Sequence, residues 1–353
     1  MFIFINLINY TLFYYFFQCF FNLLNILSKY DIFTTMEGDF MEWYHIVLIV
    51  AISVLVLVLL TSYICFRMAF YSKNKPLTDK DYYNLPNEPA FKTFEKEIIN
   101  DINEVMKYPF KEYKIKSFDG LTLYAKYFEC DHNAPMEIMF HGYRGNSTRD
   151  LSTGVKRAFR CKRNALLVDQ RASGKSDGHI ITFGIKERLD CLEWVKFASK
   201  EFGVDKKIII TGISMGAATV LMASCLDLSK NVIGVLADCG YNKPEDIIKK
   251  VIIDMKLSPK IFYPFIKLGA RLYGKFNIEE TSPYECVQKA KLPIIFFHGG
   301  NDSLVPCDMS IRLYNACASE KKLVTIENAE HGISYLTDPE KYINELNAFF
   351  TNK

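Results

Sequence analysis

A stretch near the middle of the chain, Lys207 to Ser224, narrows the range of folds more than any other part of the sequence. It reads KIIITGISMGAATVLMAS: β-prone residues lead into Gly212, Ser214 and Gly216, and helix-forming residues follow. A strand that turns sharply into a helix needs glycine wherever a side chain would collide with the neighbouring strand or helix. The stretch therefore predicts a strand, a strained turn that exposes the Ser214 hydroxyl, and a helix whose first amides point at it.

Short apolar strands alternate with helical segments on both sides of this stretch. The strand candidates are MEIMF, NALLVD, KIIIT, VIGVLAD, PIIFF and LVTIE. Ahead of them, EYKIKSFDGLTLYAKYF alternates polar and apolar residues around Asp119–Gly120, which indicates an antiparallel hairpin. The pattern predicts an α/β fold with a mostly parallel sheet, helices on both faces and a functional site at the carboxyl ends of the strands.

An uncharged segment ahead of this domain predicts a transmembrane helix. Ile46 to Phe66 is 21 residues without a charge, enough to cross the hydrocarbon core at about 1.5 Å per residue. Acidic residues precede this segment, and Arg67, Lys73 and Lys75 follow it, so the positive-inside rule places the following domain in the cytoplasm. We expect a membrane anchor over 46–66, a linker over 67–90 and the main domain over 91–353.

The apolar segment 1–45 allows two interpretations. Its first 28 residues carry no charge and would form a second, weaker span, which leaves the main domain on the same side of the membrane. In the other interpretation, translation starts at Met36 or Met41 rather than at Met1.

Composition argues against several classes of partner. The formal net charge is only +3, and no basic block interleaved with aromatic residues occurs, so no nucleic-acid partner is expected. The ten cysteines include no CxxC pair and no metal-like spacing with histidine, so no metal site is expected. Several cysteines lie in apolar runs, where a thiol behaves as a small hydrophobe. We therefore expect reduced core cysteines in a reducing compartment rather than a disulfide framework.

A serine hydroxyl needs a base and an orienting acid to act as a nucleophile at neutral pH. Among the six histidines, His331 lies after the last predicted strand, in ENAEHGIS, which favours it as the base. For the acid we choose Asp302, in the loop just past PIIFF, and Asp238, at the end of VIGVLAD, is the alternative. The predicted catalytic side chains are therefore Ser214, His331 and Asp302.

Two backbone amides are candidates for binding an oxyanion. The Met215 amide opens the helix after the serine, and the Tyr143 amide belongs to the loop after MEIMF, in HGYRGN. Arg144 and Asn146 are expected to order that loop. The segment DQRASGKSDG, which begins at Asp169, is expected to build a rigid turn with an internal ion pair.

These motifs together resemble an α/β-hydrolase. SFDGLTLYAKYF, HGYRGN, DQRASGKSDG, GISMGA, HGGNDSLVP and AEHG follow one another between about Lys111 and Phe350, and the triad order Ser, Asp, His matches that superfamily. The domain is similar to the serine aminopeptidase and acylglycerol-lipase-like branch, and to bacterial YqkD-type hydrolases. One departure is Ala172–Ser173, where the family usually carries glycine followed by a variable residue.

The leading hypothesis is a membrane-anchored serine hydrolase. It would cleave an ester or thioester of a small acyl-type substrate through an acyl-enzyme, with no metal or organic cofactor. A serine peptidase or aminopeptidase is the alternative within this class. A non-catalytic binding protein with the same fold is the alternative outside it.

An insertion at about 241–283 is predicted to form a cap over the site. Between Lys243 and Phe276, eight Lys or Arg residues outnumber three acidic ones, and apolar residues recur at helical spacing. An ordinary cap with its lysines in water is one interpretation. The other is that the cap rests on anionic lipid headgroups and admits an acyl substrate from the bilayer. The lysines expected to make that contact are Lys249, Lys250, Lys256 and Lys260.

Overall fold

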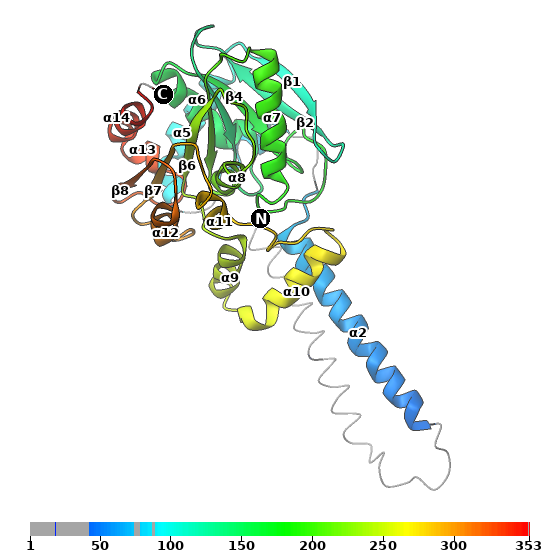
Figure 1. Cartoon of the computed structure of the whole chain (residues 1–353). Helices are drawn as coiled ribbons and strands as arrows, with labels where there is room; N and C mark the ends of the chain where they lie inside the picture. The colour runs from blue at the N-terminus through cyan, green and yellow to red at the C-terminus, as the bar shows by residue number, and fades with distance from the viewer. Residues whose placement is uncertain (1–17, 19–41, 74–77, 87–88, 352) are drawn as a thin grey trace. The chain divides into compact units, whose positions relative to one another are not determined.

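The computed structural model describes Gln18 and residues 42–73, 78–86, 89–351 and 353. It divides into two units, Met1–Val58 and Leu59–Lys353, and the second contains the sheet (Figure 1). The predicted second span lies outside the described residues, apart from Gln18.

One long helix, α2 (Glu42–Ala69), contains the predicted membrane anchor. Its segment Val47–Ala69 has a mean hydropathy of 2.9, and only 11% of its most apolar window is buried. By length and composition, this helix can cross a membrane. A buried core helix would instead hide these side chains from solvent.

Eight strands form one sheet in the second unit, in the order β1-β2-β4-β3-β5-β6-β7-β8. β1 pairs antiparallel with β2 and β2 antiparallel with β4, and every other pair is parallel. The predicted opening hairpin and the mostly parallel sheet are both confirmed. The strands are β1 (Lys111–Lys116), β2 (Thr122–Phe128), β3 (Met136–Phe140), β4 (Asn164–Asp169), β5 (Ile208–Ile213), β6 (Val232–Asp238), β7 (Ile294–Gly299) and β8 (Lys321–Ile326).

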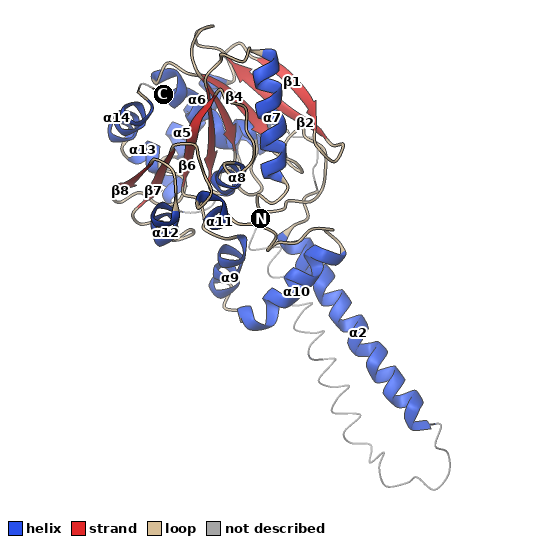
Figure 2. Ribbon diagram, viewed as in Figure 1, coloured by secondary structure: helices blue, strands red, loops and turns tan. Residues whose placement is uncertain are grey.

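Helices cover both faces of this sheet, as predicted (Figure 2). One apolar cluster joins the strands to α7, α8, α11 and α12, and two others join the opposite face to α5, α6 and α14. Residues of β3 and β4 are buried on both faces, which explains their unbroken apolar runs. The helices are α3 (Asp79–Tyr83), α4 (Pro89–Thr93), α5 (Glu95–Val105), α6 (Ser147–Arg160), α7 (Glu187–Glu201), α8 (Met215–Ala223), α11 (Pro283–Val287), α12 (Asp308–Ala316), α13 (Ser334–Thr337) and α14 (Pro339–Phe350).

The insertion between β6 and β7 contains two further helices, α9 (Pro244–Asp254) and α10 (Pro259–Leu272). Ile248 of α9 and Ile266 of α10 are buried in one apolar cluster with Met215 of α8. The inserted helices therefore share an apolar cluster with the helix that follows Ser214. This is where a cap was predicted.

The segment predicted as a linker, residues 67–90, begins as part of the second unit, Leu59–Lys353. α2 continues to Ala69, and the next residue, Phe70, is fully buried. The Phe70 ring packs edge-on against Phe183 and Phe276, at centroid distances of 5.7 and 5.1 Å. The structural boundary at Leu59 thus precedes the predicted start at residue 91, because the apolar end of the helix packs against the domain.

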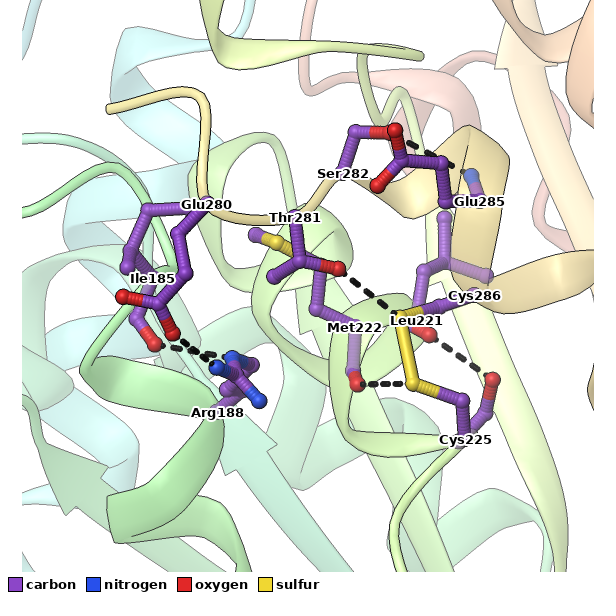
Figure 3. Close-up of a disulfide and its surroundings, with 11 residues drawn as sticks. Ile185, Arg188, Leu221, Met222, Cys225, Glu280, Thr281, Ser282, Glu285 and Cys286 are labelled. Atoms are coloured by element: carbon purple, nitrogen blue, oxygen red, sulfur yellow. Dashed lines mark hydrogen bonds and ion pairs between the residues drawn. A yellow bond between two sulfur atoms is a disulfide. The ribbon is translucent and has the colours of Figure 1, made fainter. Parts of the chain in front are cut away.

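The expectation of reduced cysteines is wrong for one pair. Cys225, just after α8, and Cys286, in α11, form a disulfide (Figure 3). They are 61 residues apart in sequence and meet because α8 and α11 pack together, which their spacing in the sequence does not reveal. The disulfide connects the end of α8 to the segment that follows the cap. Seven other described cysteines are free.

Candidate active site

Ser214 occupies the turn between β5 and α8 in a strained conformation. Its φ is 56° and its ψ is −117°, a region that residues with a side chain rarely adopt. A Cβ atom added at Gly212 would lie 2.1 Å from the Gly216 carbonyl oxygen, and one added at Gly216 would lie 2.0 Å from the Phe140 carbonyl oxygen. Both glycines are needed because the backbones approach too closely for any side chain.

The three predicted catalytic side chains form one hydrogen-bonded chain. The His331 ring lies with Nε2 2.9 Å from Ser214 Oγ and Nδ1 2.7 Å from Asp302 Oδ2. The acceptors imply that Nδ1–H donates to the carboxylate and that the serine hydroxyl donates to Nε2. Asp302 follows β7 and His331 follows β8. They meet Ser214 because parallel strands bring their carboxyl ends to one edge of the sheet.

Asp302 is surrounded by hydrogen-bond donors. Its Oδ1 accepts from the backbone amides of Leu304, at 3.0 Å, and Val305, at 2.7 Å. Its Oδ2 lies 3.2 Å from His298 Nε2, in addition to its bond with His331. Burial acts to raise the pKa of Asp302, but hydrogen bonds from His298 and His331 outweigh it and lower that pKa to about 2. The carboxylate therefore stays charged at neutral pH.

His298 is a neighbour of this site that the sequence analysis did not single out. Its Nδ1 lies 2.6 Å from Ser310 Oγ, and its Nε2 lies 2.8 Å from the Val305 carbonyl oxygen. Because both groups near Nε2 are acceptors, Nε2 carries the proton and faces Asp302. The sequence feature that could have identified His298 was its position at the end of a predicted strand, four residues before Asp302.

The alternative acid, Asp238, does not join the chain. It ends β6, and its Oδ2 accepts a hydrogen bond from the Tyr342 hydroxyl at 3.0 Å. Burial raises the pKa of Asp238 above its usual value. Asp302 therefore has the bond to His331 Nδ1 that an orienting acid requires, whereas Asp238 bonds Tyr342.

The loop after β3 passes beside the serine. A Cβ atom added at Gly142 would lie 3.7 Å from the Ser214 Cβ. His141 Nδ1 lies 2.8 Å from the Gly142 carbonyl oxygen, and His141 Nε2 accepts from the Gln170 amide at 3.1 Å. These contacts hold the peptide that ends in the Tyr143 amide.

Met215 lies on the other side of the serine, as the first residue of α8. Its amide is therefore one of those that have no acceptor within the helix. The use of the Met215 and Tyr143 amides for an oxyanion stays a prediction.

Comparisons with known proteins agree with this architecture. The esterase Pf2001 of Pyrococcus furiosus has a TM-score of 0.55 to this chain at 23% identity, covering 70% of this chain and 93% of Pf2001. The chain has the α/β-hydrolase fold. This confirms the fold that the motifs implied. No protein-family model matches the chain.

Two curated relatives extend the comparison to sequence. YqkD of Bacillus subtilis (strain 168) is 27% identical over 190 residues, which covers 54% of this chain and 62% of YqkD. Bem46 of Schizosaccharomyces pombe is 24% identical over 198 residues, which covers 55% of this chain and 60% of Bem46. The matched region thus spans less than two thirds of each relative. The resemblance to YqkD-type proteins stated from the motifs is confirmed.

The residues expected to order the loop after β3, Arg144 and Asn146, form hydrogen bonds with helices outside the sheet. The Asn146 side chain caps α6 by accepting from the Arg149 amide at 2.9 Å. Arg144 donates to the Met68 carbonyl at 2.7 Å, and the Tyr143 hydroxyl donates to the Ala69 carbonyl at 2.7 Å. The loop after β3 is thus tied to the carboxyl end of α2.

The ion pair expected within DQRASGKSDG is wrong in its partners. Arg171 pairs with Asp190 at 2.6 Å and with Asp119 at 3.0 Å, both outside that segment. Asp169 instead accepts hydrogen bonds from backbone amides, including that of Lys175 at 3.0 Å. The sequence could not reveal these partners because Asp190 lies in α7 and Asp119 in the β1–β2 turn, both distant from Arg171 along the chain. Ala172, which stands where the family carries glycine, has a φ of 62°, a value that glycine adopts without strain.

One group of side chains has the spacing of a metal site. Cys239, Asp302 and His331 each offer an atom within 4.8 Å of the others. Burial, with the nearby carboxylates of Asp238 and Asp302, raises the pKa of the Cys239 thiol well above its usual value. A protonated thiol is a poor metal ligand, and His331 already bonds Asp302 through Nδ1. The group fits a hydrogen-bonded triad better than a metal centre.

Proposed function

We propose that this chain is a membrane-anchored serine hydrolase that cleaves a carboxylic ester or thioester through an acyl-enzyme. The observation that carries the proposal is the chain of hydrogen bonds from Asp302 through His331 to the strained Ser214. The similarity to a protein named an esterase supports an ester over a peptide amide.

In the proposed acylation, His331 Nε2 removes the Ser214 hydroxyl proton as Oγ attacks the carbonyl carbon of the substrate. The carbonyl oxygen becomes an oxyanion, which the Met215 and Tyr143 amides stabilise by hydrogen bonds. Asp302 stabilises the imidazolium through the bond to Nδ1. The imidazolium then protonates the leaving alcohol or thiol as its bond to the carbonyl carbon breaks, and Ser214 keeps the acyl group.

Deacylation reverses these roles with water. His331 removes a proton from water as its oxygen attacks the acyl carbon, and the imidazolium returns that proton to Ser214 Oγ as the acid leaves. His331 carries every proton in this scheme. The scheme therefore uses no metal or organic cofactor.

A labelling experiment tests the proposal. Full-length protein in membranes should react with a fluorophosphonate probe, and Ser214→Ala should abolish that labelling. Ser224→Ala is the matched control, because Ser224 lies at the other end of α8 and its hydroxyl bonds only a helix carbonyl, that of Leu221, at 2.7 Å. Failure of the folded unmodified protein to label would reject the enzyme and favour the non-catalytic binding protein.

A substrate panel separates the two kinds of hydrolase. p-Nitrophenyl esters of increasing chain length are compared with aminoacyl amides. Faster turnover of the amides would overturn the ester assignment in favour of the peptidase.

We also propose that α2 anchors the enzyme with its catalytic unit in the cytoplasm. The basic residues after the helix support this side, whereas the Cys225–Cys286 disulfide is more typical of an oxidising compartment. Seven free cysteines among the described residues, which include the exposed Cys130, favour a reducing compartment. We give them more weight than the single disulfide. Protease added to intact cells should leave the catalytic unit undigested, and digestion from outside would reverse the orientation.

A further inference from the structure

The cap is packed directly on the carboxyl end of the anchor helix. A Cβ atom added at Gly269 of α10 would lie 2.4 Å from the Ser62 carbonyl oxygen and 2.9 Å from the Phe66 Cβ. The glycine allows the two helices to approach this closely. The Tyr273 hydroxyl donates to the Leu59 carbonyl at 2.9 Å. These contacts lie within the unit Leu59–Lys353.

These contacts set the depth of the cap relative to a membrane. Arg67 lies in the last turn of α2, where a cation marks the headgroup region. Leu59, which Tyr273 contacts, lies eight residues earlier, or about 12 Å deeper along the helix axis. The carboxyl end of α10 therefore lies on the hydrocarbon side of Arg67 whenever α2 spans a bilayer.

The outer face of the cap combines apolar and basic side chains. On α10, Lys260, Pro264 and Arg271 are exposed at a spacing that keeps them on one side of the helix. No carboxylate among the described residues lies within ion-pair distance of Lys256, Lys260 or Arg271. The exposed apolar side chains of the cap are Val251 (39% exposed), Ile253 (56%), Ile261 (53%) and Leu272 (46%).

Two of the lysines expected to face lipid bond other groups of the protein. Lys249 pairs with Glu245 and lies over the ring of the buried Tyr263, 4.8 Å from its centroid. Lys250 pairs with Asp254 and donates to the Ser303 carbonyl. Both lysines are therefore engaged by the protein. Basic residues that remain for headgroups are Lys256, Lys260 and Arg271.

We propose that this outer face, defined by Lys256, Lys260, Ile261, Arg271 and Leu272, docks on an anionic bilayer and draws the substrate from it. Apolar side chains enter the headgroup boundary while basic ones bind anionic lipid, as in interfacial helices. Buried residues of the same helices belong to one apolar cluster with Met215, the residue after the serine. The substrate class is an ester or thioester with a long acyl chain held in the membrane, which rests on the proposed serine hydrolase.

The test uses the full-length chain in vesicles of phosphatidylcholine alone or mixed with phosphatidylglycerol. Turnover of a long-chain acyl ester in the bilayer is compared with turnover of p-nitrophenyl acetate in solution. The unmodified protein should process the long-chain ester about a hundredfold faster in the anionic vesicles where docking limits turnover, because each of the three basic residues favours docking about fivefold. Equal rates in both vesicles would overturn the docking proposal.

Charge reversal locates the contact. Lys256→Glu, Lys260→Glu and Arg271→Glu together should remove the anionic advantage, while turnover of p-nitrophenyl acetate reports that the variant is folded. The matched control reverses three exposed lysines near the amino ends of parallel strands. These are Lys200, in the last turn of α7, Lys230, just before β6, and Lys291, just before β7. This variant should keep the faster turnover in anionic vesicles. Loss of the advantage in the control, or its retention in the cap variant, would overturn the assigned face.

A measurement without turnover separates this inference from the proposed enzyme. In Ile261→Trp, the new indole should be quenched by brominated lipid more strongly than the indoles of the unmodified chain. Absence of quenching beyond that of the unmodified chain would overturn docking even if both esters are hydrolysed. Such additional quenching without hydrolysis of either ester would support docking and reject the serine hydrolase.

Discussion

The carboxyl ends of β6 and β7 each lead to a buried aspartate, and the two differ in acid–base character. Asp302 accepts hydrogen bonds from two histidines and two backbone amides, and its pKa falls to about 2. Asp238 accepts from the Tyr342 hydroxyl, and burial raises its pKa. Position at a strand end therefore does not determine the role of a carboxylate. Its role is determined by the hydrogen-bond donors that surround it.

The largest expected effect tests whether the region around Asp302 is catalytic at all. Ser214→Ala and His331→Ala should each lower kcat by about 10⁶, because residues that act as one unit fail together. Ester turnover by the full-length protein in membranes measures this loss. Activity above about one hundredth of the unmodified rate in either variant would show that Ser214 and His331 do not act as one catalytic unit. The two aspartates could then no longer be compared as candidate acids of that unit.

The second prediction sets the two aspartates against each other. Asp302→Asn should lower kcat by about 10⁴, because the amide no longer holds His331 in the required tautomer. Asp238→Asn should lower kcat less than tenfold, about the range left to a residue outside the triad. A larger loss in Asp238→Asn than in Asp302→Asn would show that the acid has been misassigned.

The third prediction concerns stability against pH. The folded-state pKa of Asp302, about 2, lies below its usual value of 3.8, so its contribution is present above that usual value and is lost as pH falls toward 2. The shift corresponds to about 2 kcal/mol, of which about 1 kcal/mol is lost by pH 3. Asp302→Asn should therefore destabilise the protein more at pH 6 than at pH 3.

Denaturant unfolding of the full-length chain in detergent, followed by circular dichroism, measures this difference. Asp238→Asn is the control, because the pKa of Asp238 is raised rather than lowered. A destabilisation by Asp302→Asn that does not change with pH would contradict the low pKa of Asp302.

The smallest expected effect tests the contribution of one hydrogen bond to Asp302, the one from His298. His298→Asn removes a donor that faces Asp302 Oδ2 at 3.2 Å and should lower kcat about tenfold, since Asp302 keeps its bond to His331. The acidic limb of the pH–rate profile should also move to higher pH, which a loss of packing alone would not cause. An unmoved pH profile would show that His298 does not tune this carboxylate.

Much of the fold could be predicted because its signals are local. Gly212 and Gly216 mark a close backbone approach, and the sequence places Asp302 and His331 after strands of a parallel sheet. Such a sheet brings strand ends together, so the three side chains were expected at one edge of the sheet. A helix able to cross a membrane was equally accessible, since its length and lack of charge are read directly from the sequence.

Other features depend on contacts between segments that are distant in sequence. The pairing of Arg171 with Asp190, the disulfide between Cys225 and Cys286 and the choice of Asp302 over Asp238 all depend on which elements become neighbours. The sequence by itself therefore determined the strand–turn–helix at Ser214, the α/β architecture and a helix able to cross a membrane, because sterics and hydrophobic periodicity act over a few residues. Only the tertiary structure decided that the end of this helix joins the inserted helices and the loop after β3, because side-chain partners are selected by packing.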